Sequence, residues 1–288
     1  MKLIVALPYH TGDHLAATRL LEWIKELSPF QDATSLVLVA DNAVPMEIKK
    51  PMDVLGKSIF STCETIMPQC PSAVNGNYHI PAAVMFEKTA SHIMTCYKDW
   101  PWLWMEPDCV PLVPHWLLQI YGAYELCPKR YMGSTMQTGG KDGLPQTMFF
   151  GTAIYPHDAH KELQKFCDGK RAFDASFSDY VVPRGANSKL FQHVYGDGKD
   201  APSFKDVKGP NDGPNVGTLE SISKDAVLFH RCKDGSLIEQ LRKQLFKPQD
   251  AAPEMNILVE QPVKRGPGRP RKNPEPTETL LTSQHQIE

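Results

Sequence analysis

Short, continuously apolar runs that alternate with amphipathic stretches constrain this chain more than any other feature. The runs cover residues 3–7, 36–40 and 102–105, and each has the length of a strand. Between them, apolar residues recur at helical spacing in two stretches, from Gly12 to Leu27 and from about Pro81 to Lys98. Apolar strands joined by helices form parallel sheets covered on both faces. The sequence therefore predicts a mixed, mainly parallel α/β sheet with helices on both sides.

The second half of the chain continues this alternation. We expect a strand over residues 147–155, a helix over about 157–167 and a short final strand over 226–229 that delivers His230. Residues 183–217 contain many Gly, Pro and Asn residues, so this segment predicts loops. A long proline-containing connection is expected between the second strand and the helix that begins near residue 81.

Polar residues follow three of the predicted strands at the point where each strand ends. They are residues 8–10, 41–42 and 106–108. In open α/β sheets, ligands bind at the carboxyl ends of the strands. These three clusters are therefore expected to converge on one edge of the sheet.

The acidic turn Glu106-Pro107-Asp108 is the most informative of these clusters. It follows a buried aromatic strand, and its two carboxylates are separated by a single proline. Carboxylate oxygens are ligands for hard cations such as Mg²⁺ and Mn²⁺, and apolar walls strengthen the field of a bound ion. The alternative interpretation is a strand end whose acids only face solvent.

Several classes of protein are excluded by what the sequence lacks. No Gly-x-Gly-x-x-Gly follows the first strand, and neither a Walker sequence nor Gly-x-Ser-x-Gly occurs. Seven cysteines without a Cys-x-x-Cys favour reduced intracellular thiols over a disulfide framework or a zinc ribbon. No apolar run has the length of a signal peptide or a membrane span, so we expect a cytoplasmic protein without a membrane partner.

The order of these motifs resembles that of GT-A glycosyltransferases, which use nucleotide-sugars and bind metal through Asp-x-Asp. The resemblance covers roughly residues 1–245 and implies a GT-A, Rossmann-like fold. Glu106-Pro107-Asp108 stands in the Asp-x-Asp place, and His230 matches the late histidine that completes the metal shell. The resemblance thus implies that Asp108, His230 and Glu106 bind Mn²⁺ or Mg²⁺. Because Glu106 departs from the family's first Asp, it is expected to hold the donor ribose or a metal-bound water. The alternative for a lone histidine after a strand is a structural role.

The same resemblance implies donor-binding residues, with UDP-glucose as the default donor. The end of the first strand, Pro8 and Tyr9, would cradle the nucleobase, and Asp41 would bond the base or the ribose. Lys233, in the loop after His230, resembles the family's basic loop over the diphosphate. Lys88 stands near a further diphosphate-binding position, although a solvated surface lysine is an equally good interpretation.

A catalytic base is implied for the segment from Ala172 to Tyr180, because inverting members of the family place a carboxylate there. Asp174 is the first candidate and Asp179 the second. Either would take the proton of the acceptor hydroxyl. The alternative is that Asp174 caps a helix, since Asp is a preferred N-cap residue.

The C-terminal residues 248–288 differ in kind from the folded domain, residues 1–247. Prolines, glutamines and charges dominate after Lys247 and aromatic residues vanish, which predicts disorder. Within this tail, residues 263–273 resemble an AT-hook, which binds the minor groove of AT-rich DNA. The residues that carry this resemblance are Gly268, Arg269 and Pro270 at the core and Lys264, Arg265, Arg271 and Lys272 on the flanks. The alternative is a basic linker.

A sugar-transferring domain joined to a DNA-binding tail indicates that DNA is the acceptor. A hydroxymethylated pyrimidine offers the alcohol that ordinary bases lack, so the resemblance implies a phage DNA-modification enzyme in the host cytoplasm. On position alone, the acceptor side is expected to include Arg184, Lys189, His193 and Tyr195. Two alternatives remain open: a glycosyltransferase acting on a protein or surface glycan, and a non-catalytic DNA-binding module.

Overall fold

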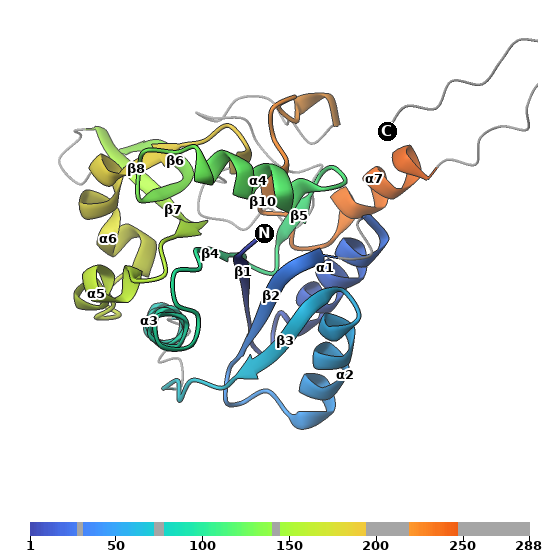
Figure 1. Cartoon of the computed structure of the whole chain (residues 1–288), viewed down its shortest axis with the longest axis horizontal. Helices are drawn as coiled ribbons and strands as arrows, with labels where there is room; N and C mark the ends of the chain where they lie inside the picture. Colours follow the sequence, from blue (N-terminus) through green and yellow to red (C-terminus); the bar gives the residue numbers. More distant parts are fainter. Residues whose placement is uncertain (28–30, 72–77, 140–144, 194–218, 247–288) are drawn as a thin grey trace, which may run out of the picture. The chain divides into compact units, whose positions relative to one another are not determined.

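A central sheet organises the fold of the computed structural model, which describes residues 1–27, 31–71, 78–139, 145–193 and 219–246 (Figure 1). Its strands are β1 (Leu3–Tyr9), β2 (Gln31–Ala40), β3 (Phe60–Ile66), β4 (Trp102–Trp104), β6 (Tyr131–Gly139), β7 (Pro145–Tyr155) and β8 (Gly185–Asn187). Their order across the sheet is β3-β2-β1-β4-β7-β6-β8. The predicted tail, residues 248–288, lies outside the described residues.

The pairing of these strands is mainly parallel. β1 pairs in parallel with β2 and β4, β2 with β3, and β6 with β8. Among the described strands of this sheet, only β7 runs antiparallel to its neighbours, which are β4 and β6. The predicted fold class, a mixed and mainly parallel α/β sheet, is therefore confirmed.

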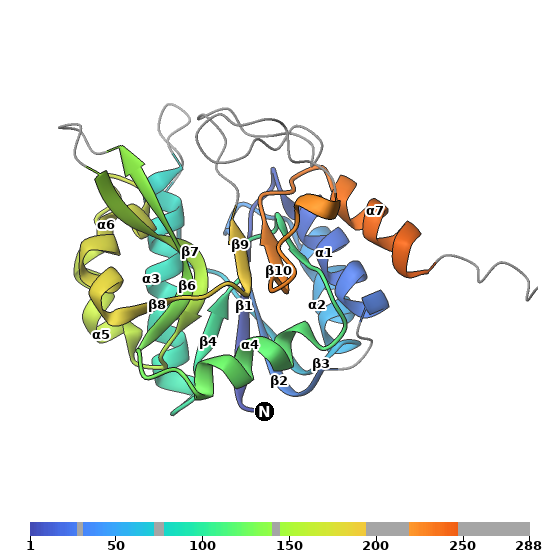
Figure 2. The ribbon, with the colours of Figure 1, turned by 90° about the horizontal axis from the view of Figure 1, so that it is seen from above.

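Helices cover both faces of the sheet (Figure 2). On one face lie α1 (His14–Leu27) and α2 (Met46–Lys57), and on the other lie α3 (His79–Cys96), α5 (Ala159–Leu163) and α6 (Phe173–Val181). The period of two along β1 explains the division, because Val5 and Leu7 pack with the first group, and Ile4 and Ala6 with the second. Each of these four side chains is fully buried. None of the helices in the described ranges is both long and apolar enough to cross a bilayer.

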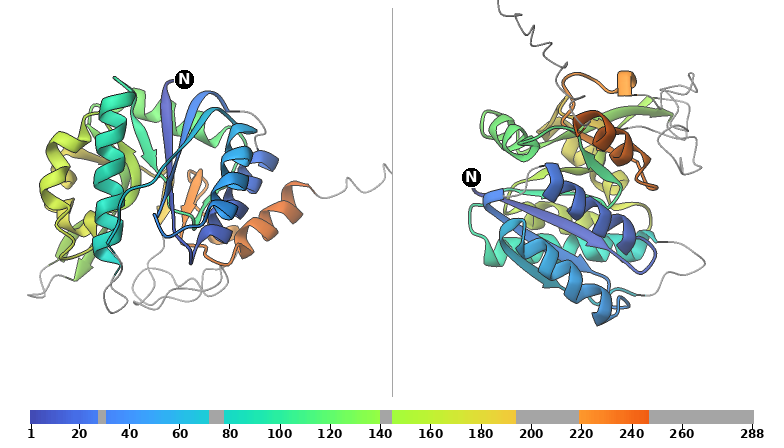
Figure 3. Two further views of the ribbon diagram at one scale, coloured as in Figure 1. Left: turned by 90° about the horizontal axis from the view of Figure 1, so that it is seen from below. Right: turned by 90° about the vertical axis from the view of Figure 1, so that its right-hand side faces the viewer.

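A second, three-stranded sheet brings the later part of the chain next to the acidic turn that follows β4. It consists of β5 (Cys109–Pro111), β10 (Leu228–His230) and β9 (Phe191–His193), in that order. The helices α4 (Trp116–Glu125) and α7 (Ser236–Leu245) pack with it in the core that includes α1. The views of Figure 3 show α7 alongside α1, where Arg242 forms an ion pair with Glu26 at 2.7 Å.

Two segments differ from the sequence-based expectation. The expected connection before residue 81 contains α2 and β3. The helix was hidden because Pro51 lies inside it and because Lys49 takes a buried position on its face. Within the segment expected to form loops, residues 185–187 and 191–193 form the short strands β8 and β9. Their three-residue lengths leave too little pattern for the sequence to reveal them.

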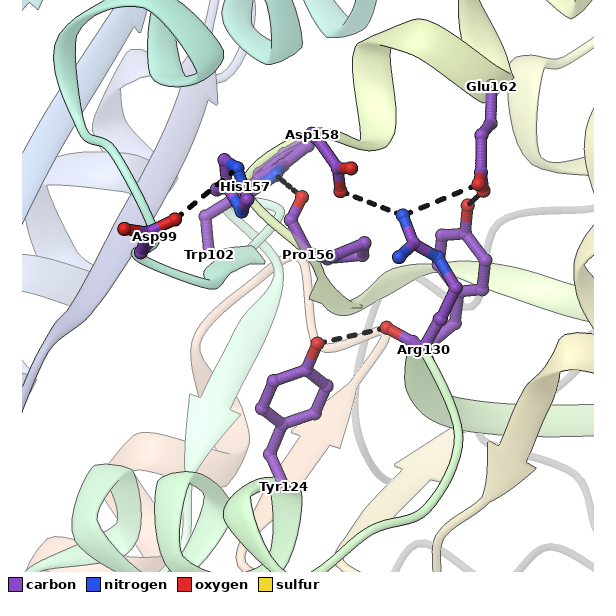
Figure 4. Close-up of polar contacts among 9 residues, drawn as sticks. Asp99, Trp102, Tyr124, Arg130, Pro156, His157, Asp158 and Glu162 are labelled. Atoms are coloured by element: carbon purple, nitrogen blue, oxygen red, sulfur yellow. Dashed lines mark hydrogen bonds and ion pairs between the residues drawn. The ribbon is translucent and has the colours of Figure 1, made fainter.

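A polar network fixes the end of the sheet at which β4 begins (Figure 4). The guanidinium of Arg130 donates to the Asp158 carboxylate at 2.7 Å and lies 3.4 Å from a Glu162 oxygen. The indole N–H of Trp102, the first residue of β4, donates to the Pro156 carbonyl at 3.1 Å. This network connects the antiparallel part of the sheet to α5. The acidic turn of residues 106–108 lies at the opposite end of β4.

Candidate active site

Two strands from different sheets bring the acidic turn and the late histidine together. Glu106 and Asp108 follow β4 directly, and His230 is the last residue of β10. The register of β10 on β5 aligns His230 with Cys109. The backbone N–H groups of Arg231 and Cys232 then donate to the Asp108 carbonyl at 3.2 and 2.9 Å.

His230 lies between the two carboxylates. Its Nε2 is 3.1 Å from Asp108 Oδ1 and 3.2 Å from Glu106 Oε2. Burial alone would lower the pKa of His230, but the charges of Asp108 and Glu106 outweigh burial and raise it to about 10. For Asp108, burial works against ionisation, and the neighbouring His230 prevails and lowers the pKa of that carboxyl. The metal-free site thus contains a buried imidazolium where two carboxylates converge.

The donor set of this cluster fits a divalent cation. Asp108, Cys109 and His230 each place one ligand atom within 4.8 Å of the others. Asp108 Oδ1 is buried and lacks a well-directed hydrogen bond from any described residue, although His230 Nε2 lies near it. A carboxylate suits Mn²⁺ or Mg²⁺, and an imidazole is a common ligand of divalent first-row transition metals, of which Mn²⁺ is one.

Cys109 is the member of the cluster that the sequence argument missed. Its side chain is 1% exposed, and its Sγ lies 3.5 Å from the Thr152 hydroxyl. Burial, followed by the charge of Asp108, raises the pKa of this thiol well above its usual range. Because only a thiolate is a good metal ligand, the carboxylate and the imidazole remain the expected cation-binding groups.

A pocket of about 400 Å³ opens beside the acids. Besides Glu106 and Asp108, it is lined by the turn after β1, by the first turns of α1 and by Lys233. Arg19 of α1 places a second basic side chain in its wall. Arg19 packs closely over Gly235, where a Cβ would lie 2.4 Å from Arg19 Cδ and where φ is +75°. The pocket therefore combines an acidic wall with two basic residues.

A second pocket of about 340 Å³ adjoins the first, because both are lined by His10 and Gly12. The rings of His10 and Tyr78 are stacked, with centroids 5.7 Å apart and planes at 15°. Asp41 also lines this pocket, and its carboxylate accepts a hydrogen bond from the Ala43 N–H at 2.7 Å. Aromatic surfaces beside a carboxylate are suited to a planar, polar ring.

Some of the predicted donor-binding residues line the two pockets, and others are buried in the core. Asp41, Glu106 and Lys233 line the two pockets. Pro8 and Tyr9 are buried in β1, and Tyr9 is only 1% exposed in the core beneath α1 and α2. Burial raises the pKa of Tyr9 to about 12. The strand extends two residues beyond the predicted end, so Tyr9 takes the core face.

Lys88 lies away from both pockets. It is exposed on α3, and its ammonium lies 3.0 Å from the Glu87 carboxylate. The structure therefore favours the surface interpretation for this lysine. His10, which the sequence argument placed in the polar cluster without assigning a role, takes the position in the pocket wall that Tyr9 was expected to hold.

Of the two candidate bases, the structure brings Asp174 to the site. Asp174 lies in the first turn of α6, and the Ala175 N–H donates to its Oδ1 at 2.8 Å. Burial, with a further contribution from Glu106, raises the pKa of Asp174 to about 6. Glu106 in turn packs closely against Gly151 of β7, where a Cβ would lie 3.2 Å from Glu106 Oε1. Asp179 instead faces the exposed end of α6, where Gln146 donates to it at 3.3 Å.

No protein-family model matches the chain, and no curated protein matches it by sequence. Among solved structures, the galactosyltransferase LgtC, in complex with donor and acceptor sugar analogues, is 8% identical with a TM-score of 0.49, over 86% of this chain and 98% of that one. Mouse xyloside xylosyltransferase 1 is 12% identical with a TM-score of 0.47, over 80% and 97% of the two chains.

A further solved structure is core-mannan synthase A from Aspergillus fumigatus in a Mn/GDP form. It is 8% identical with a TM-score of 0.43, over 66% of this chain and 73% of that one. At these identities and TM-scores, the likeness carries no argument about activity. Any assignment of function therefore depends on the site itself.

We predict that Asp174→Asn stabilises the metal-free protein above pH 6 and has little effect at acid pH. A carboxyl whose pKa is about 6 when folded and 3.8 when unfolded loses stability as the pH rises through this range. At about 1.4 kcal/mol per pH unit, the difference is worth about 3 kcal/mol, and part of it should be recovered in the variant. Urea denaturation at pH 4 and pH 8 in a chelator measures it. An equal effect at the two pH values would contradict the assigned environment.

We also predict that Mn²⁺ binding releases about one proton at pH 7.5. His230, with a pKa of about 10, is protonated in the metal-free site and must be neutral to bind a cation. Apparent affinity should therefore rise about tenfold per pH unit below this pKa. Titration calorimetry in two buffers of different ionisation enthalpy measures the release. Identical heats in both buffers would show that Mn²⁺ binding releases no proton, and this would contradict the prediction.

Proposed function

We propose that this chain is a metal-dependent glycosyltransferase that uses a nucleotide-sugar donor. The observation that supports the proposal is the position of His230, which meets Asp108 and Glu106 at the wall of a pocket that also contains Arg19 and Lys233. A cation held by carboxylate and imidazole beside basic residues suits a diphosphate. The adjoining pocket with the stacked rings suits its nucleobase.

The chemistry follows from the charges that the reaction creates. When a sugar leaves a nucleotide-sugar, negative charge develops on the diphosphate, and a bound divalent cation would stabilise that charge. Arg19 and Lys233 line the same pocket and would add fixed positive charge. Asp41, in the wall of the adjoining pocket, is placed to bond the base or ribose.

Asp174 supplies the basic group that the acceptor requires. A carboxyl with a pKa of about 6 is largely ionised at neutral pH, yet it binds protons more tightly than an ordinary aspartate. A general base works best when its pKa lies near the working pH. Asp174 would thus accept the proton of the acceptor hydroxyl while the new glycosidic bond forms.

For the acceptor, we propose a hydroxymethylated pyrimidine in DNA. The support is the sequence of the tail, where residues 263–273 resemble an AT-hook and lie outside the described residues. A weak DNA tether raises the local concentration of acceptor without preventing turnover, and the target base must be extruded or reached from the groove. A protein or a surface glycan remains the alternative acceptor, and a non-catalytic DNA-binding module the second alternative.

The donor and acceptor proposals are tested together by nucleoside mass spectrometry. We predict that the protein, incubated with Mn²⁺, a panel of UDP-sugars and 5-hydroxymethylpyrimidine DNA, adds a hexose or pentose mass to the modified nucleoside. Asp108→Ala should lower the rate at least about 100-fold, since it removes charge stabilisation of the leaving group. Asp168→Ala, which changes an exposed aspartate near Lys170, serves as the matched control.

The outcomes separate the three candidate functions. Hydrolysis of a UDP-sugar without DNA modification would leave the donor assignment standing and move the acceptor to a protein or glycan. The absence of transfer, hydrolysis and UDP-sugar binding would contradict the enzyme proposal and leave the DNA-binding module.

We predict that deletion of residues 248–288 slows modification of long AT-rich DNA by about tenfold or more at low DNA concentration. The reason is the loss of the tether, and the rate on a free hydroxymethylated nucleoside should stay unchanged. Initial rates at several salt concentrations measure the effect, because a lost phosphate-contacting segment also flattens the salt dependence. Equal rates on long DNA with and without the tail would contradict DNA recruitment.

A further inference from the structure

A second histidine stands directly behind His230. His193 is the last residue of β9, and the parallel register of β9 on β10 aligns the two histidines. Their Nδ1 atoms are 2.7 Å apart, which is a hydrogen-bond distance. On its other side, the His193 ring is stacked on Phe150 of β7, with centroids 3.4 Å apart and planes at 17°. The ring is thus held between an aromatic face and the candidate cation ligand.

The contact between two Nδ1 atoms requires that one of them carries the shared proton. If His193 held it, His230 would accept at Nδ1, and its own proton would lie on Nε2, toward Asp108 and Glu106. That tautomer of His230 cannot bind a cation through Nε2. If His230 holds the proton, its Nε2 can offer a lone pair to a cation. The direction of this one hydrogen bond therefore decides whether His230 is able to be a ligand.

The surroundings of His193 favour the role of acceptor. The His230 Nε2 faces Asp108 Oδ1 at 3.1 Å and Glu106 Oε2 at 3.2 Å, so a cation held by these acids would take the Nε2 lone pair and leave the one proton of the His230 ring on Nδ1, where His193 accepts it. A neutral ring that accepts at Nδ1 carries its proton on Nε2. That Nε2 is buried and has no hydrogen-bond partner among the described residues, so no neighbour there holds the ring in the opposite tautomer.

We propose that His193 is a positioning residue whose Nδ1 accepts the His230 Nδ1 proton and so directs the His230 Nε2 lone pair to the cation held with Asp108. This inference rests on the metal site of the proposed function. Ligating histidines commonly donate their second ring N–H to a carboxylate, a carbonyl or water, which fixes the ring and its tautomer. Here the Nδ1 of a second histidine takes that place. The stack on Phe150 fixes the plane of His193, and hence the direction of its lone pair.

Two substitutions separate this role from simple packing. His193→Phe keeps a flat ring against Phe150 and removes the acceptor. His193→Asn loses most of the ring and keeps an oxygen near the position of Nδ1. A packing role predicts that Phe is the milder change, whereas the positioning role predicts that Asn is. His160→Phe is the matched control, since His160 is a largely buried histidine bonded to Glu87 at 2.8 Å, away from both pockets.

The first measurement is the Mn²⁺ dissociation constant at pH 7.5, from the electron paramagnetic resonance signal of free Mn²⁺, on full-length variants with unchanged circular dichroism. His193→Phe should raise the constant about 10- to 100-fold, the usual cost of removing a partner of a ligating histidine. His193→Asn should recover most of the loss, and His160→Phe should bind as the wild type does. If the wild type binds Mn²⁺ and His193→Phe binds it equally well, the positioning role is overturned and the proposed function stands. If the wild type does not bind Mn²⁺, both fall.

The second measurement needs no metal. Long-range ¹H–¹⁵N spectra of the histidine-labelled, metal-free protein report which ring nitrogen is protonated. We expect His193 as the Nε2–H tautomer and a proton on Nδ1 of His230. The reverse assignment, with the proton on His193 Nδ1, would overturn the inference whatever the Mn²⁺ affinity. This measurement also stands if folding defects prevent the use of His193→Phe.

Discussion

The contact of His230 with Asp108 and Glu106 is the interaction on which the other features of the site depend. It joins a residue of the small sheet to the acidic turn that follows the central strand β4. The His230 and Asp108 side chains are largely buried, and that of Glu106 is partly buried. Burying charges costs free energy unless they are paired and hydrogen-bonded. Here two carboxylates share one imidazolium, so the cluster retains negative charge. The two backbone hydrogen bonds to the Asp108 carbonyl hold the turn in place despite this imbalance.

The remaining negative charge of this cluster helps to explain the raised pKa of the neighbouring Asp174. Asp174 keeps its proton to about pH 6 because burial and Glu106 oppose its ionisation. A proton bound to Asp174 and a cation bound at Asp108 would thus each offset the negative charge of the same acidic cluster. A bound cation favours the ionised form of Asp174, since an ion is the largest local charge in such a site. Under the proposed function, cation binding at Asp108 and ionisation of Asp174 would therefore be coupled through this field.

The sequence predicted the elements with long, uniform patterns and missed those without them. Residues 3–7 and 102–105 read as buried strands because no polar residue interrupts them, whereas Pro51 disguised α2. At the site, the strand ends were predicted to within two residues. Because side chains alternate between the faces of a strand, the longer β1 points Tyr9 into the core, and His10 lines the pocket in its place. For Lys88, a helical pattern shows which face of α3 is buried but not what the exposed face meets, and the structure has this lysine beside Glu87 and outside the lining of both pockets. Arg19 gave no signal in the sequence, because its contact with Gly235 joins residues that are far apart along the chain.

The register of the small sheet is the least visible and most consequential feature. Cys109, His230 and His193 form one row across its three strands. Residues in such a row share a face, and a slip by one residue would move each to the opposite face. The register of this row therefore sets the positions of His230, of its partner His193 and of the acidic turn before Cys109 together. Strands this short have few hydrogen bonds to specify register, so packing must do it, and Leu228 and Phe229 are both 1% exposed in the core shared with α1. The hydrophobic packing of β10 is thus what aligns the charged groups of the site.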